Sequence, residues 1–184
     1  MHTIQDATRV AQILLSIPVI NGIELFGSVA RDGEGKDIDL ILVVSEEGCG
    51  HFVAAARDLA RLVAGLKAAG DTSLLFLEES SICFTGLPPS LRDVEYEKGE
   101  DGFTAPSRLE YLLTETFGPM AEEALTKLQE EELDSVDVLC FPTDWREKID
   151  KVQRLLPHRD PGFVFSLVRD AIPFDKEKAA FTRL

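Results

Sequence analysis

Five consecutive apolar residues at 40–44 constrain the fold of this chain more than any other feature. The run from Leu40 to Val44 is rich in β-branched side chains, which is typical of a strand that is buried on both faces of its sheet. Asp37 and Asp39 lie two residues apart at the start of this run. Because side chains alternate along a strand, we expect both carboxylates to point to the same face, with Cα atoms about 7 Å apart.

Two carboxylates held this close on an apolar strand repel each other and lose hydration, a cost that cations commonly offset. Carboxylate oxygens suit Mg²⁺ or Mn²⁺, and a two-metal site needs its ions roughly 3.5–4 Å apart. We therefore expect Asp37 and Asp39 to bind two divalent ions. The competing interpretation is that both residues cap an ordinary loop.

A glycine-serine pair precedes the two aspartates. The segment from Ile23 to Phe26 is apolar except for Glu24, and it predicts a short buried strand that ends at Gly27 and Ser28. Glycine lets the backbone approach a ligand closely, and Ser28 is a candidate N-cap for a helical turn over 29–31. Because free N–H groups at a helix N-terminus favour anions, this turn is a candidate phosphate-binding site.

Two basic residues lie between the turn and the aspartates. Arg31 is a candidate phosphate contact, and a surface ion pair with Asp32 or Glu34 is the alternative. Lys36 is a candidate for the same role, with no role as its alternative.

The stretch from Leu25 to Arg31, followed by Asp37 to Leu40, resembles the signature of the nucleotidyltransferase superfamily related to DNA polymerase beta. The similarity is closest to the minimal and aminoglycoside-type bacterial members. It implies an α+β fold, a mixed β-sheet flanked by helices, in which the glycine-serine turn holds nucleotide phosphates. The paired carboxylates would then bind two divalent ions. Val29 departs from the family, where arginine or tyrosine often follows the serine.

Members of this superfamily use a third acidic residue on a later strand. The segment from Val136 to Phe141 predicts an apolar strand with a single carboxylate, Asp137, a costly placement unless that group has a partner. We expect Asp137 to complete the metal site and to help deprotonate the attacking hydroxyl. The competing candidate is Asp93, whose alternating surroundings also fit the solvated face of an antiparallel strand.

The net charge of −14 over 184 residues opposes binding to a long polyanion, because phosphate contacts need lysine or arginine. We therefore expect a small acceptor with amino and hydroxyl groups, or a basic protein partner, rather than transfer RNA or DNA. Three scattered cysteines lack disulfide or zinc spacing. The chain shows no secretion signal and no apolar run of membrane-spanning length, which predicts a cytoplasmic protein.

The chain is expected to form one domain over 1–184. Periodic apolar residues predict helices at 6–17, 51–69 and 106–133, the last broken at Gly118-Pro119, and a further helix at 145–156. Short strands predict a hairpin-type insertion at about 71–105, and a helical tail is expected at about 145–184.

These features predict an enzyme that moves a nucleoside monophosphate from a nucleoside triphosphate to a hydroxyl of a small molecule or protein and releases pyrophosphate. Two alternatives remain open at this point. One is an antitoxin-like minimal nucleotidyltransferase that acts through a protein partner. The other is a degenerate family member without activity.

Overall fold

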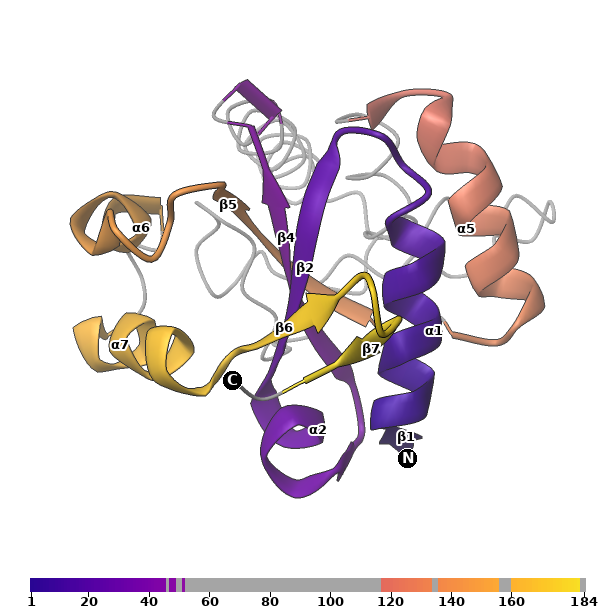
Figure 1. The fold of residues 1–184 in the computed structure, drawn as a ribbon, viewed down its shortest axis with the longest axis horizontal. Coiled ribbons are helices and arrows are strands. Elements are labelled where there is room, and N and C mark those ends of the chain that lie inside the picture. Colours follow the sequence, from indigo (N-terminus) through magenta and orange to yellow (C-terminus); the bar gives the residue numbers. More distant parts are fainter. Residues whose placement is uncertain (46, 49–50, 52–116, 134–135, 156–159, 183–184) are drawn as a thin grey trace, which may run out of the picture.

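A mixed five-stranded sheet forms the centre of the computed structural model, which describes residues 1–45, 47–48, 51, 117–133, 136–155 and 160–182 (Figure 1). One pair of neighbouring strands, β4 and β5, is parallel, and the other neighbours are antiparallel. In spatial order the strands are β5 (Val136–Pro142), β4 (Ile38–Val44), β2 (Ile20–Phe26), β6 (Ile172–Asp175) and β7 (Ala180–Phe181).

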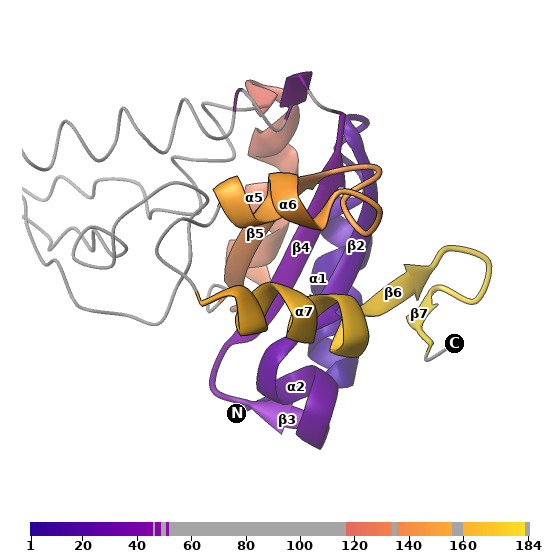
Figure 2. The ribbon, with the colours of Figure 1, turned by 90° about the vertical axis from the view of Figure 1, so that its left-hand side faces the viewer.

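Helices cover both faces of the sheet, which Figure 1 shows between its two helix layers and Figure 2 shows from the face that carries α6 and α7. Helices α1 (Ile4–Leu14) and α5 (Met120–Glu130) pack on one face, and α6 (Ile149–Leu155) and α7 (Pro161–Asp170) lie on the other. The short helix α2 (Gly27–Asp32) follows β2 and leads into β3 (Glu34–Gly35), which pairs with β1 (His2–Thr3). The predicted α+β class, with a mixed sheet between helices, is confirmed.

Strand β4 is buried on both faces, as its sequence predicted. Leu40 and Leu42 belong to the core beneath α1 and α5, whereas Ile41 and Val43 belong to the core beneath α6 and α7. Leu40, Ile41 and Leu42 have no exposed surface. Each such side chain contributes about 1.5–3 kcal/mol relative to full exposure, so the central strand anchors both layers.

Several element boundaries differ from those predicted. Helix α1 begins at Ile4, two residues before the predicted start, because Thr3 and Asp6 form a capping box. The helix predicted at 145–156 begins only at Ile149, since the preceding residues form a turn in which the Trp145 N–H donates to the carbonyl of Pro142 at 3.0 Å. The expected helical tail at about 145–184 contains α6 and α7, and it also supplies strands β6 and β7 to the sheet.

The break predicted at Gly118-Pro119 is confirmed. Gly118 has a φ of 61°, Pro119 is the N-cap of α5, and the helix runs from Met120. The helix predicted at 51–69 beyond His51, the insertion at about 71–105 with Asp93, and residues 106–116 lie outside the described part of the chain. No helix among the described residues is long and apolar enough to cross a membrane.

Candidate functional site

Asp39 and Asp137 lie side by side on neighbouring parallel strands. Their Cα atoms are partners in the register of β4 with β5, and adjacent strands are about 4.8 Å apart, so the two side chains leave the same face of the sheet. Asp39 is half-buried and Asp137 is only 6% exposed. The structure therefore brings together two of the three predicted carboxylates, from positions 98 residues apart in the chain (137 − 39).

Gly27 lies directly against the carboxylate of Asp39. Phe26 is the antiparallel partner of Asp39, and the chain then turns at Gly27 with a φ of 73°. A Cβ atom at position 27 would overlap the Oδ2 and Cγ atoms of Asp39. Glycine is needed at this turn both for its backbone conformation and for the space that the carboxylate occupies.

Ser28 does not cap the helix, so this part of the prediction is wrong. Helix α2 already begins at Gly27, and its N-cap is Phe26, which makes no side-chain capping bond. The Ser28 hydroxyl instead packs against the Cα of Gly35 in β3, where it fills the space that a Cβ would need. The short distance from the end of β2 to the helix leaves no room for a separate capping residue.

A cavity of about 980 Å³ opens beside the two aspartates. Its walls come from the end of β2, helix α2, strands β4 and β5, helix α7 and the start of β6. This volume is at the upper end of the range for small-molecule sites, which is about 300–1,000 Å³. The charged and turn residues of its lining include Gly27, Arg31, Asp39, Asp137, Arg146 and Asp170.

Asp37 and Lys36 lie apart from this cavity. Both side chains are exposed in the bend before β4, and neither contributes to the lining of the cavity. Strand β4 begins at Ile38, so Asp37 lies outside the strand and the alternation of side chains does not align it with Asp39. Within the described residues, no group of three or more His, Cys, Asp or Glu side chains is arranged to hold a metal ion.

Two exposed arginines at the cavity pair with the next residue in the chain. Arg31 bonds Asp32 at 2.7 Å and Arg169 bonds Asp170 at 2.6 Å, with the arginine side chains 70% and 76% exposed. These carboxylates raise the pKa of both guanidinium groups, which stay cationic at any ordinary pH. For Arg31, the structure shows the surface pair with Asp32 that was the alternative to phosphate contact.

A polar cluster around the buried carboxylate of Glu24 lies on the same face of the sheet, and the sequence interpretation did not identify it. Glu24 is 8% exposed and accepts a hydrogen bond from Trp145 Nε1 at 2.9 Å. Its carboxylate also forms an ion pair with Arg146, which follows Trp145 in the turn after β5. The available signal was Glu24 itself, a single carboxylate in an otherwise apolar strand segment.

The fold and the cavity thus define an α+β protein with two adjacent carboxylates and three arginines around one pocket. No family model, curated protein or solved structure matches the chain.

Proposed function

We propose that this protein is a metal-dependent nucleotidyltransferase with the DNA polymerase beta-like fold. It transfers a nucleoside monophosphate from a nucleoside triphosphate to a hydroxyl of a small molecule or protein, and releases pyrophosphate. The observation that supports this proposal is the placement of Asp39 and Asp137 side by side, next to the glycine turn, in a cavity of about 980 Å³.

The two cavity carboxylates fit a divalent ion of the Mg²⁺ type. Mg²⁺ is usually held by one or two carboxylates, with substrate phosphates and water completing its coordination, rather than by a cage of protein ligands. Asp39 and Asp137 supply such a pair of hard oxygen donors. The resemblance implies two ions held by Asp37 and Asp39, with Asp137 as a further ligand of the second. Asp37 itself lies in the exposed bend before β4 and does not line the cavity.

The side chains then have distinct roles. Asp39 and Asp137 hold the ion, and Asp137 assists deprotonation of the acceptor hydroxyl. When bound, the divalent ions neutralise phosphate charge and lower the pKa of the attacking hydroxyl. Gly27 allows close approach of the phosphates.

The basic and polar residues of the turn contact the phosphates. Arg31 exchanges its surface pair with Asp32, which is weak because it is exposed to solvent, for a bidentate phosphate contact. Ser28 takes part through its backbone, because its hydroxyl packs on Gly35. Lys36 adds a cation near the same turn.

Thermal unfolding with ATP and MgCl₂ tests the metal site. A ligand that binds only the folded state raises stability by about 2.7 kcal/mol at 100 times its Kd. We expect the magnesium-dependent increase in Tm to disappear in Asp39→Asn and in Asp137→Asn. Glu130→Gln, which makes the same charge change on α5 across the sheet, should keep the full increase.

Magnesium-dependent release of pyrophosphate, or incorporation of labelled nucleotide, then tests transfer itself. Both signals should be lost in Asp39→Asn and retained in Glu130→Gln. An unchanged increase in Tm in Asp39→Asn would exclude the proposed metal site. We expect Asp37→Asn to lose less activity than Asp39→Asn or Asp137→Asn, because Asp37 does not line the cavity.

The charge of the molecule favours a second candidate role, an antitoxin-like transferase that acts on a protein partner. The net charge of −14 suits a basic protein as acceptor better than another anion. Co-purification of a small basic protein, and its modification by labelled nucleotide, would support this version of the proposal. Modification of small hydroxyl compounds alone would favour the first.

A further inference from the structure

Arg146 connects the sheet to the C-terminal end of α7. Its guanidinium donates hydrogen bonds to the carbonyl oxygens of Val168 at 2.6 Å and Ala171 at 3.1 Å. The last four carbonyls of a helix have no partner within the helix, and a cation at this end also complements the helix dipole. Arg146 therefore satisfies carbonyl groups that α7 cannot satisfy itself.

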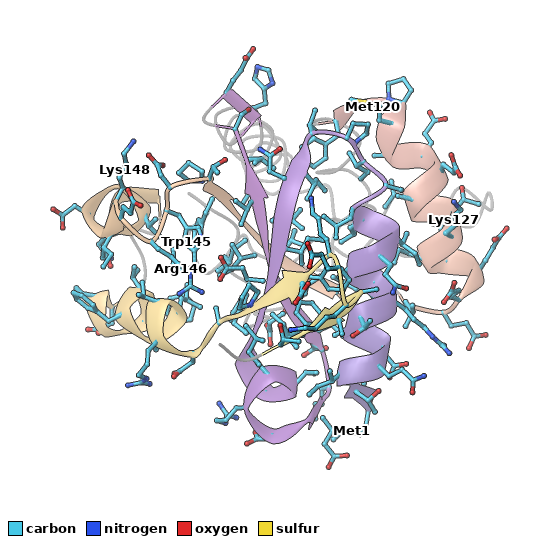
Figure 3. The ribbon with its side chains drawn as sticks, viewed as in Figure 1. Met1, Met120, Lys127, Trp145, Arg146 and Lys148 are labelled. Atoms are coloured by element: carbon cyan, nitrogen blue, oxygen red, sulfur yellow. The ribbon has the colours of Figure 1, made fainter. Side chains whose placement is uncertain are left out.

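Glu24 fixes the other side of this guanidinium. Its carboxylate, in the central strand β2, pairs with Arg146 and accepts the Trp145 Nε1 hydrogen. The guanidinium carbon lies 4.8 Å from the centre of the Trp145 ring, which packs in turn on Phe141 of β5. Figure 3 shows Trp145 and Arg146 on the side of the sheet that carries α6 and α7. We name Glu24, Trp145 and Arg146 the clamp.

The donors of Arg146 are almost fully used within the protein. The guanidinium has five N–H groups. Nε donates to Glu24, Nη1 donates to Val168, and Nη2 donates to both Glu24 and Ala171. Although Arg146 lines the cavity, little capacity remains for a bound anion. Its contacts fit a residue that positions other groups.

We propose that the clamp is a positioning device for the cavity. It holds the C-terminal end of α7 at a fixed distance from the strands that carry Asp39 and Asp137, because Glu24 and Arg146 span from β2 to the last turn of that helix. Ser166, Arg169 and Asp170 on this helix line the cavity opposite the two aspartates. The effect on ligand affinity rests on the proposed function, whereas the effect on α7 does not.

Hydrogen exchange of the free protein tests the clamp without any ligand. Arg146→Lys keeps a charge for Glu24 but lacks the planar fork that reaches two carbonyls as well. We expect faster exchange of the amides at 163–172, with the amides of α1 unchanged. Lys148→Ala removes a nearby cation that pairs with Asp144 at the surface, and it should leave both sets unchanged.

A second variant covers the risk that an imperfectly paired Glu24 unfolds the protein. The double substitution Glu24→Gln and Arg146→Gln removes both charges of the clamp, and it should show the same local increase in exchange. Unchanged exchange at 163–172 in both variants, or an increase spread evenly over α1 and α7, would overturn the clamp.

The affinity for MgATP, measured by calorimetry well below the Tm of each variant, separates positioning from general stability. We expect Arg146→Lys to weaken binding about tenfold, with Lys148→Ala equal to the wild type. Loss of stability with unchanged affinity would overturn the positioning of the ligand site. If the wild type itself does not bind MgATP, the proposed function fails, and the exchange result alone decides the role of the clamp.

Discussion

The contact between Gly27 and Asp39 is the most constrained point of the candidate site. The carboxylate occupies the space where any other residue at position 27 would place its Cβ, and the backbone there has a positive φ. Gly33, at the other end of α2, also has a positive φ of 86°, but nothing lies within 4 Å of the position of a Cβ. The two glycines therefore separate backbone strain from steric overlap.

Replacing each glycine by alanine should give different losses of stability. Gly33→Ala should lose about 1–2 kcal/mol of stability, the cost of a left-handed backbone for a residue with a Cβ atom. Gly27→Ala should have the same backbone cost and must also displace Asp39, which adds about 1–3 kcal/mol, the usual cost of overpacking. Chemical denaturation of both variants measures the difference, and equal losses would mean that Asp39 moves aside freely.

The sequence predicted some site residues well and others poorly, for physical reasons. The meeting of Asp39 with Asp137 was implied by the resemblance, and both residues could be located because each lies in or beside a strongly apolar strand segment. The pairing of these strands leaves little freedom in register. The predictions for Asp37 and Ser28 depended on the first residue of a strand and of a helix. A sequence pattern does not fix such boundaries to a single residue. Arg146 gave no sequence signal, because its partners Glu24 and Ala171 are remote in the chain.

At the scale of elements, α1 begins with reciprocal side-chain and backbone bonds. The hydroxyl and the N–H of Thr3 both donate to the Asp6 carboxylate at 2.8 Å, and the Asp6 N–H donates to the hydroxyl at 3.3 Å. The bonds from Thr3 lower the pKa of Asp6 in the folded protein. The cap therefore contributes stability above the unfolded pKa, near 3.9, and this contribution is lost as the pH falls through the folded pKa.

Asp6→Asn should therefore lower the free energy of unfolding at pH 7, and the gap to the wild type should narrow as the pH falls below about 4. Urea denaturation across this range measures the gap. In the background of Thr3→Ala, which itself costs about 1 kcal/mol, the pH-dependent part should shrink but persist, because the backbone N–H of residue 3 still donates to the Asp6 carboxylate. A gap that stays constant at acid pH would show that the Asp6 carboxylate is not held by Thr3.

The elements that the sequence predicted correctly are those with a strong local pattern. Strands β2, β4 and β5 and helix α1 each bury a clear apolar face, so their periodicity was visible. Strand β6 was not predicted because it is short, contains Pro173, and exists through its pairing with β2 at Leu25 and Glu24. A turn precedes α6 where the first residues of the helix at 145–156 were predicted. In this turn Trp145 and Arg146 bond to Glu24 as part of the clamp.

At the scale of the whole molecule, charge limits which partners can bind. The chain has 33 acidic and 19 basic residues, and the arginines at the cavity already have acidic or carbonyl partners. Few lysines and arginines of the described structure are therefore left to contact the phosphates of a nucleic acid, and such contacts supply most of the affinity.

Fluorescence anisotropy with a labelled RNA hairpin and a labelled DNA duplex should therefore show no binding at physiological salt. The expected reason is the repulsion between the net charge of −14 and the phosphates. Submicromolar binding that weakens steeply with added salt would contradict this prediction.

The position of β6 in the sheet has a consequence for biosynthesis. Strand β2 pairs on one side with β4, which ends at Val44, but on its other side with β6, whose residues begin at position 172. Until those residues emerge, the nascent chain has an open sheet edge at Leu25 and Glu24, the kind of edge that invites aggregation. Translation that stops before residue 172 thus yields a polypeptide with both aspartates in place and its central strand unprotected.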